Sequence, residues 1–236
     1  MPPSGSAARA PSRVHRPVLD WTFWAAAALT CATFVRAVAF TPVEATQGPA
    51  QKIFYVHLPA AWVAFLAFFI VALTSAVYLW LRDERLDLVA ASSAEVGVVF
   101  TTVVLVTGPL WGRPVWGTWW TWDARLTSTL FLWLIYLGYL VLRGAVDDRA
   151  MRARFSAVLG ILGALLIPFI HLSVYLFRTL HPMPIVGKPG RPNLPSEMLT
   201  TLLLALASFT LLYAAMLRAR YRLAVQQAAL EQEGAD

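Results

Sequence analysis

Six long apolar runs restrict the folds that this sequence can adopt. A helix needs about 20 consecutive apolar residues to cross the roughly 30 Å of hydrocarbon in a bilayer. Charged residues make up only 14% of the chain, against about 25% in soluble domains, so they cannot cover a water-soluble globule. We therefore expect an all-α polytopic membrane protein with six transmembrane helices. The six runs are residues 21–40, 62–81, 90–110, 126–142, 155–177 and 197–217.

Two of these runs differ from an ordinary span. The fourth has 17 residues, which rise about 25 Å at 1.5 Å each, so it spans only if Arg143 snorkels or the bilayer thins. The first run ends near Ala37, Val38 and Ala39, a pattern similar to a signal-peptide cleavage site. Arg36 interrupts the approach to that site and the run is long enough to span, so we expect a retained helix.

The basic residues predict the topology and the domain organisation. With a cytoplasmic N-terminus, twelve of the 19 Lys and Arg residues fall on the inner side, as the positive-inside rule requires. The net charge of +6 is then a topology signal, and we expect no nucleic-acid partner. We expect cytoplasmic tails at residues 1–20 and 218–236, and one membrane domain at 21–217. Its longer, Pro- and Gly-rich outer loops would be residues 41–61, 111–125 and 178–196.

Tryptophan is concentrated in one of these outer loops. Five of the ten tryptophans fall within twelve residues: Trp111, Trp116, Trp119, Trp120 and Trp122. An aromatic belt at the membrane interface explains tryptophans scattered over helix ends, but it does not explain such a cluster. Packed indole rings form a flat, polarisable surface with N–H donors at its edge. A large planar ligand such as a porphyrin or a quinone would suit that surface.

The end of the loop carries two charged residues. In a helix that starts at Thr118, Trp116, Trp119, Trp120 and Asp123 would share one face by their spacing. Arg125, two residues beyond Asp123, would then be free for an anionic group such as a haem propionate. Anchoring of Arg125 at the membrane interface is an equal alternative.

Two histidines fall on the same predicted side of the membrane as the tryptophans. His57 lies just ahead of the second apolar run, with Pro59 suited to the first helical turn, and His181 follows the fifth run. A helix N-terminus disfavours the protonated imidazole, and neutral imidazole is the form that binds metals. Two such imidazoles could ligate one haem iron from opposite sides. Taken singly, a loop histidine is more often an ordinary polar residue, but the location of both on the same side as the tryptophan cluster favours the ligand interpretation.

Two further residues bear on the chemistry. His171 lies inside the fifth run, where it could hydrogen bond structurally, line a cavity or belong to a haem pathway. Cys31 is the single cysteine and lies inside the first run. The sequence has no Cys-x-x-Cys-His motif, so the chain is not itself expected to be a c-type cytochrome.

Three motifs resemble a known family. The segment WGRPVWGTWWTWDARLTS at residues 111–128 resembles the tryptophan-rich "WWD" signature of haem-handling membrane proteins. YVHLPAAW at 55–62, and the segment 173–181 that ends in TLH, resemble the two histidine motifs of that superfamily. With six spans and this length, the chain is most similar to the haem exporter C (CcmC) family of cytochrome c maturation. The resemblance covers about residues 41–217.

This resemblance implies a function. His57 and His181 would be the axial ligands of a non-covalent, b-type haem, and the tryptophan-rich loop would cover the macrocycle. The chain would be a haem-delivery subunit rather than an enzyme, located in the bacterial cytoplasmic (inner) membrane. Its partners would be a membrane-tethered haem chaperone (CcmE-like), an ATP-binding-cassette pair (CcmA/CcmB-like) and a small single-span subunit (CcmD-like). The residues expected to contact haem are His57, His181, Trp111, Trp116, Trp119, Trp120, Trp122, Asp123 and Arg125.

Three other functions fit part of the sequence pattern. A haem lyase, which joins haem to apocytochrome thiols, is the main alternative, but lyases of this superfamily are longer and have more spans. An electron-transferring cytochrome b needs paired histidines inside facing helices, whereas only His171 lies inside a span here. A quinone-binding subunit would account for the aromatic surface but not for two outward histidines.

Overall fold

The computed structural model describes residues 18–183 and 194–233, and its regular structure in those ranges is helical. Six helical segments are long and apolar enough to cross a membrane, which confirms the predicted fold class. The elements in order are α1 (Trp21–Val35), a π-helical turn (Arg36–Phe40), a 3-10 helix (Pro49–Ile53), α2 (Phe54–Leu81), α3 (Glu84–Trp116), α4 (Ala124–Ala145), α5 (Arg149–Ala164), α6 (Leu166–Leu176) and α7 (Ser196–Glu233).

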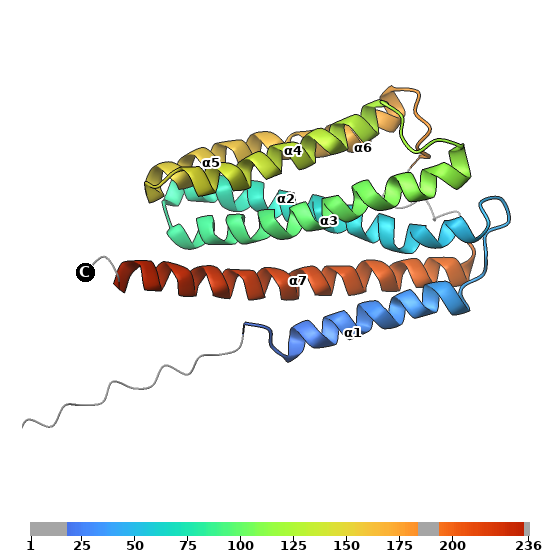
Figure 1. The fold of residues 1–236 in the computed structure, drawn as a ribbon, viewed down its shortest axis with the longest axis horizontal. Helices are drawn as coiled ribbons and strands as arrows, with labels where there is room; N and C mark the ends of the chain where they lie inside the picture. The colour runs from blue at the N-terminus through green and yellow to red at the C-terminus, as the bar shows by residue number, and fades with distance from the viewer. Residues whose placement is uncertain (1–17, 184–193, 234–236) are drawn as a thin grey trace, which may run out of the picture.

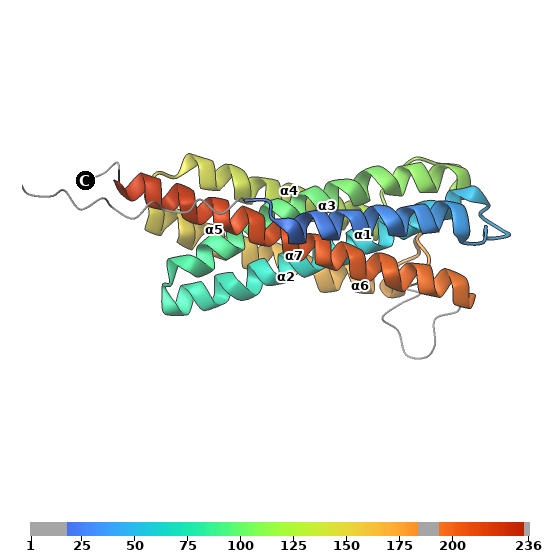
Figure 2. The same ribbon diagram turned by 90° about the horizontal axis from the view of Figure 1, so that it is seen from below.

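The helices run side by side along the long axis of the molecule (Figure 1). The α2–α3 hairpin lies in the centre, α7 packs against both of its helices, and α1 packs against α7. On the opposite side lie α4 and the α5–α6 pair, and Figure 2 shows α1 and α7 covering the near side of the bundle. The start of α1 and the end of α7 point to one end, which we call the terminal end. The α3–α4 connection lies at the other, which we call the loop end.

Aspartates and left-handed residues set the ends of the helices. The carboxylates of Asp20, Asp83, Asp123 and Asp148 accept backbone N–H bonds at the starts of α1, α3, α4 and α5. The chain ends α2 at Arg82, with φ of 58°, and ends α3 at Gly117, with φ of 77°. Glycine is suited to that left-handed conformation because it has no Cβ.

Close packing of aromatic and small residues holds the centre of the bundle. Phe68 of α2 stacks on Tyr136 of α4 with ring centroids 3.7 Å apart. A Cβ at Gly97 would lie 2.6 Å from the Phe68 ring, so glycine at this position allows α2 and α3 to approach. The Tyr136 hydroxyl donates to the carbonyl oxygen of Gly160 at 2.8 Å, which ties α4 to α5.

Ion pairs join the helices at the terminal end. Arg143 of α4 makes two bonds to Asp87 of α3, at 2.6 and 2.8 Å. Arg220 of α7 pairs with Glu95 of α3. Arg218 and Arg222, also of α7, pair with Asp20 at the start of α1 at 3.1 and 2.8 Å.

Several helices are longer than their apolar runs. The fourth span has 22 residues and rises about 33 Å, because α4 continues beyond its apolar run at both ends. The third continues to Trp116, and the second begins at Phe54, which shortens the predicted loops 41–61 and 111–125. The last continues to Glu233, so most of the predicted tail 218–236 is helical. Apolar runs mark the hydrocarbon core of the membrane and not the polar capping residues beyond it.

The fifth span is broken, which the sequence analysis did not predict. The α-helix is interrupted at Leu165, between α5 and α6, and Pro168 follows three residues later. A proline in a helix cannot donate to the carbonyl four residues earlier and its ring crowds that carbonyl, here the one of Ala164. Below the break α5 packs against α2 and α4, whereas beyond it α6 packs mainly against α4. Beyond the break, α6 therefore packs little against α2.

Candidate functional site

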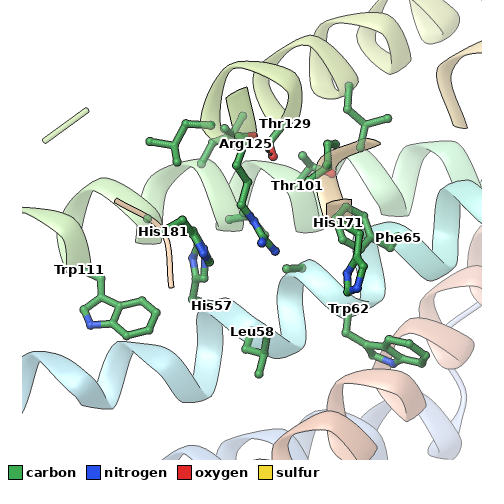
Figure 3. Close-up of a pocket in the computed structure, with 18 of the residues that line it drawn as sticks. His57, Leu58, Trp62, Phe65, Thr101, Trp111, Arg125, Thr129, His171 and His181 are labelled. Carbon is green, nitrogen blue, oxygen red and sulfur yellow. Dashed lines mark hydrogen bonds between the residues drawn. The ribbon is translucent and has the colours of Figure 1, made fainter. Parts of the chain in front are cut away.

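An open cavity of about 1270 Å³ occupies the loop end of the bundle. Its walls come from α2, α3, α4, α6, α7, the segment that connects α3 to α4 and the residues after α6. The walls are mostly apolar, and three histidines and an arginine line the cavity (Figure 3). Most of the predicted site residues meet here, although they come from segments far apart in the sequence.

His57 enters the cavity from the first turns of α2. The 3-10 helix at Pro49–Ile53 leads directly into α2, so His57 is the fourth residue of the helix. The expectation that Pro59 lies in the first turn is therefore wrong, because the helix begins at Phe54. The His57 ring lies beside Trp111, with centroids 5.8 Å apart, and its Nδ1 lies 2.9 Å from the hydroxyl oxygen of Thr107 on α3.

The hydrogen bonds of Thr107 determine which His57 nitrogen carries hydrogen. The Thr107 hydroxyl has one hydrogen, and it donates this hydrogen to the carbonyl of Val103 at 2.7 Å. It therefore accepts from Nδ1 of His57, which carries the N–H. In the neutral imidazole the lone pair is then on Nε2. Thr107 thus leaves Nε2 of His57 free for a metal.

His181 reaches the same cavity from the segment after α6. Its backbone N–H donates to the hydroxyl of Thr179 at 3.1 Å, and its Nδ1 lies 3.1 Å from the carbonyl oxygen of Pro182. Because a carbonyl only accepts, Nδ1 is again the donor and Nε2 has the lone pair. Burial, and secondarily the charge of Arg125, lower the pKa of His181 to about 4. His181 is therefore neutral at pH 7, the form that binds metals.

Arg125 places a positive charge in this apolar cavity. It lies in the first turn of α4, whose N-terminus is capped by Asp123. The Nη1 atom is buried and has no hydrogen-bond partner among the described residues. Figure 3 shows the side chain extending between His57 and His171. A buried, unpaired guanidinium is costly, so an anionic group of a ligand would complete this site.

The tryptophans divide into two groups. Trp111, Trp116, Trp119 and Trp120 line the cavity. The ring centroids of Trp116 and His181 are 6.1 Å apart, and the buried Nε1 of Trp120 has no acceptor among the described residues. Trp122 is 77% exposed and does not line the cavity, although its ring packs edge-on against Trp120.

The expected helix from Thr118 does not form. The chain leaves α3 at Gly117 and stays irregular until α4 begins at Ala124. Asp123 does not share a helical face with the tryptophans, because its carboxylate accepts from the N–H groups of Arg125 and Leu126 at 2.9 Å. Asp123 lies outside the cavity lining and positions Arg125 by capping α4.

Three residues that matter to the site were either not predicted or predicted without a single role. Thr107 lies 50 residues from His57, and no local motif connects the two. Pro168 is a proline inside the fifth apolar run, and it lies three residues after the interruption that separates α6 from α5. His171, whose role was left open, lines the same cavity as the histidine pair.

The chemistry of the cavity fits haem. Two imidazoles with free Nε2 atoms can ligate an iron that already has four porphyrin nitrogens. Indole rings can contact the macrocycle, and Arg125 can pair with a carboxylate. The described residues contain no cluster of three or more His, Cys, Asp or Glu side chains that could hold a bare metal ion.

Comparison with known proteins agrees with the motifs. The family model described as heme exporter protein C matches residues 5–235. The chain belongs to this family. Heme exporter protein C of Bradyrhizobium diazoefficiens is 40% identical over 196 residues, which cover 83% of this chain and 74% of that protein. The heme exporter protein C relatives of Haemophilus influenzae and Paracoccus denitrificans are 38% and 34% identical, over 79% and 91% of this chain and 76% and 89% of theirs. The family predicted from the three motifs is thereby confirmed.

Proposed function

We propose that this chain is the haem-binding subunit of a haem export and delivery complex in cytochrome c maturation. The family name supports a role in haem export rather than catalysis. The observation that carries the proposal is the pair of histidines from two distant segments, each hydrogen bonded through Nδ1, that line one cavity. The chain provides ligation, orientation and a contact surface, and the iron and porphyrin provide the reactivity.

His57 and His181 are the axial ligands in this proposal. Their Nε2 atoms bind the iron, the cavity-lining tryptophans contact the macrocycle, and Arg125 pairs with a propionate. The haem is b-type and non-covalent. Covalent attachment through thioethers needs cysteines near the ligand, and the single cysteine, Cys31, is exposed on α1 and does not line the cavity.

The tryptophan-rich segment also presents the bound haem to a partner. Trp119 is 57% exposed although it lines the cavity, and Trp122 is more exposed still. Exposed aromatic side chains beside a ligand site suit protein recognition. The partner is a membrane-tethered haem chaperone, with an ATP-binding-cassette pair and a small single-span subunit completing the complex.

The proposed orientation places the loop end outside. Arg143, Arg149, Arg218, Arg220 and Arg222 belong to the ion pairs of the terminal end. A concentration of arginines at one end supports a cytoplasmic location for that end under the positive-inside rule. The chain then lies in the bacterial cytoplasmic membrane with both termini inside, and the membrane domain is residues 21–217.

The amount of haem loaded onto the chaperone distinguishes a haem-delivery function from a haem lyase activity. Cells that lack this chain should contain the chaperone without haem, and the wild-type gene should restore loading. His57→Ala and His181→Ala variants, present in the membrane at wild-type amounts, should fail to restore it. If the chaperone were loaded normally without this chain and only the final attachment to apocytochrome failed, the lyase function would hold instead.

A further inference from the structure

The cavity extends beyond the histidine pair into the membrane span. Figure 3 shows His57 and His181 together, then the guanidinium of Arg125, and then His171 with Phe65 and Trp62 near it. His171 is the sixth residue of the 11-residue α6, about 8 Å from the loop end of that helix. Apolar side chains form the wall around this inner part, including Phe65, Phe69, Ile167, Ile170 and Leu211.

No contact among the described residues explains why a histidine lies at position 171. It makes no hydrogen bond with any described residue, and its closest aromatic neighbour is Tyr175 with ring centroids 6.5 Å apart. An imidazole within a membrane span is costly unless its nitrogens find a partner. Because His171 lines the cavity, a ligand there can provide that partner.

The inner part of the cavity opens sideways towards lipid. Trp62 and Phe69 on α2 and Leu211 on α7 line it, yet they are 49%, 58% and 52% exposed. In a membrane span, exposure of the outer surface means contact with the acyl chains. The break at Leu165 contributes to this opening, because α6 packs mainly against α4 while α5 packs against α2.

We propose that His171 and the apolar walls around it form a second haem-binding position, inside the membrane and open to lipid. Haem dissolved in the bilayer reaches this position first, with His171 as its one axial ligand. It then passes to His57 and His181 at the loop end. Arg125, which lies between the two positions, can pair with a haem carboxylate in either. This inference rests on the proposed haem-binding function.

A ligand-deletion series tests for the second position. The His57→Ala/His181→Ala double variant of the full chain would be purified into lipid nanodiscs and titrated with haem. We expect weaker binding than in the wild type, with a high-spin spectrum of one imidazole ligand. Adding His171→Phe, which keeps an aromatic ring, should abolish that spectrum, and adding His171→Met should replace it with a thioether-ligated one. Absence of haem binding in the double variant, or a spectrum that does not change when residue 171 is substituted, would overturn the inference.

Loading kinetics test the order of the two positions. His171→Phe alone should reach the wild-type spectrum when haem is supplied from albumin in water, which also shows that the variant is folded. Loading from haem dissolved in phosphatidylcholine vesicles should be several-fold slower, because residue 171 no longer binds the haem that arrives from the bilayer. Equal rates from vesicles would overturn the inference but leave the proposed function standing. A wild-type spectrum independent of His57 and His181 would instead overturn the proposed function.

Discussion

His57 donates from Nδ1 to the hydroxyl of Thr107, 2.9 Å away, and so keeps its Nε2 atom free for iron. The direction of this bond is fixed because the Thr107 hydrogen is already donated to the Val103 carbonyl. The two partners lie on neighbouring helices, α2 and α3, so the orientation of the His57 imidazole depends on the packing of the central hairpin.

Replacing Thr107 should weaken haem binding without removing a ligand. Thr107→Val keeps the shape of the side chain but cannot accept from Nδ1, so the ring loses its fixed orientation. The Kd for haem should rise by about 10- to 100-fold, as for other partners of metal-bound histidines. Thr107→Ser keeps the hydroxyl and should bind as the wild type does. Equal affinities for the Val and Ser variants, measured by haem titration, would disprove the role of this bond.

Binding through His181 should resist mild acid. Iron binds the neutral imidazole, and burial and Arg125 lower the pKa of His181 to about 4. Protonation therefore competes only as the pH falls towards 4. In a His57→Ala variant, the haem affinity should stay almost constant between pH 7.5 and 5.5. With an ordinary histidine pKa of about 6.5 it would fall roughly tenfold over that interval, and such a fall would contradict the lowered pKa.

Substitutions in the two groups of tryptophans should affect haem binding and haem delivery differently. Trp120 lines the cavity, so Trp120→Ala should cost about 1 kcal/mol of haem binding, or roughly fivefold in Kd. Trp122→Ala should leave the affinity unchanged, because this ring lies outside the cavity, but it should slow transfer to the chaperone. Haem titration and a chaperone-loading assay check the two effects. A loss of haem affinity in Trp122→Ala would contradict this division.

The ion pair between Asp87 and Arg143 should matter for stability. Both side chains are largely buried, at 13% and 14% exposure, so Asp87→Asn would leave the charge of Arg143 uncompensated between α3 and α4. We expect a loss of about 3 kcal/mol in the free energy of unfolding. The double variant Asp87→Leu/Arg143→Met, which removes both charges, should recover most of it. Denaturant unfolding in detergent gives both values, and a double variant less stable than Asp87→Asn would be the contrary result.

The number of spans could be predicted from the sequence, but the helix ends could not. The length of an apolar run reflects the thickness of the bilayer, which is why six runs gave six spans. Helix ends depend instead on residues such as Asp123 and Gly117, whose roles follow from local backbone geometry. Side-chain spacing alone therefore predicted a helix through Asp123, where the chain turns.

The site could be predicted in part. His57, His181 and Arg125 could be assigned to one end of the bundle because topology places their segments there. The partnership of His57 with Thr107 depends on the register between α2 and α3, which apolar periodicity does not determine. His171 lies beyond the broken span at Leu165, and apart from Pro168 the continuous apolar run gives no sign of that break.

The spectra of haem bound to the purified protein most directly test the central claim that His57 and His181 ligate the iron. Haem bound to the wild-type chain should give the low-spin optical and electron paramagnetic resonance signals of two imidazole ligands. His57→Ala and His181→Ala should each lose these signals, and added imidazole should restore them by filling the vacant position. Unchanged bis-imidazole signals in both variants would contradict the assignment of His57 and His181 as the axial ligands.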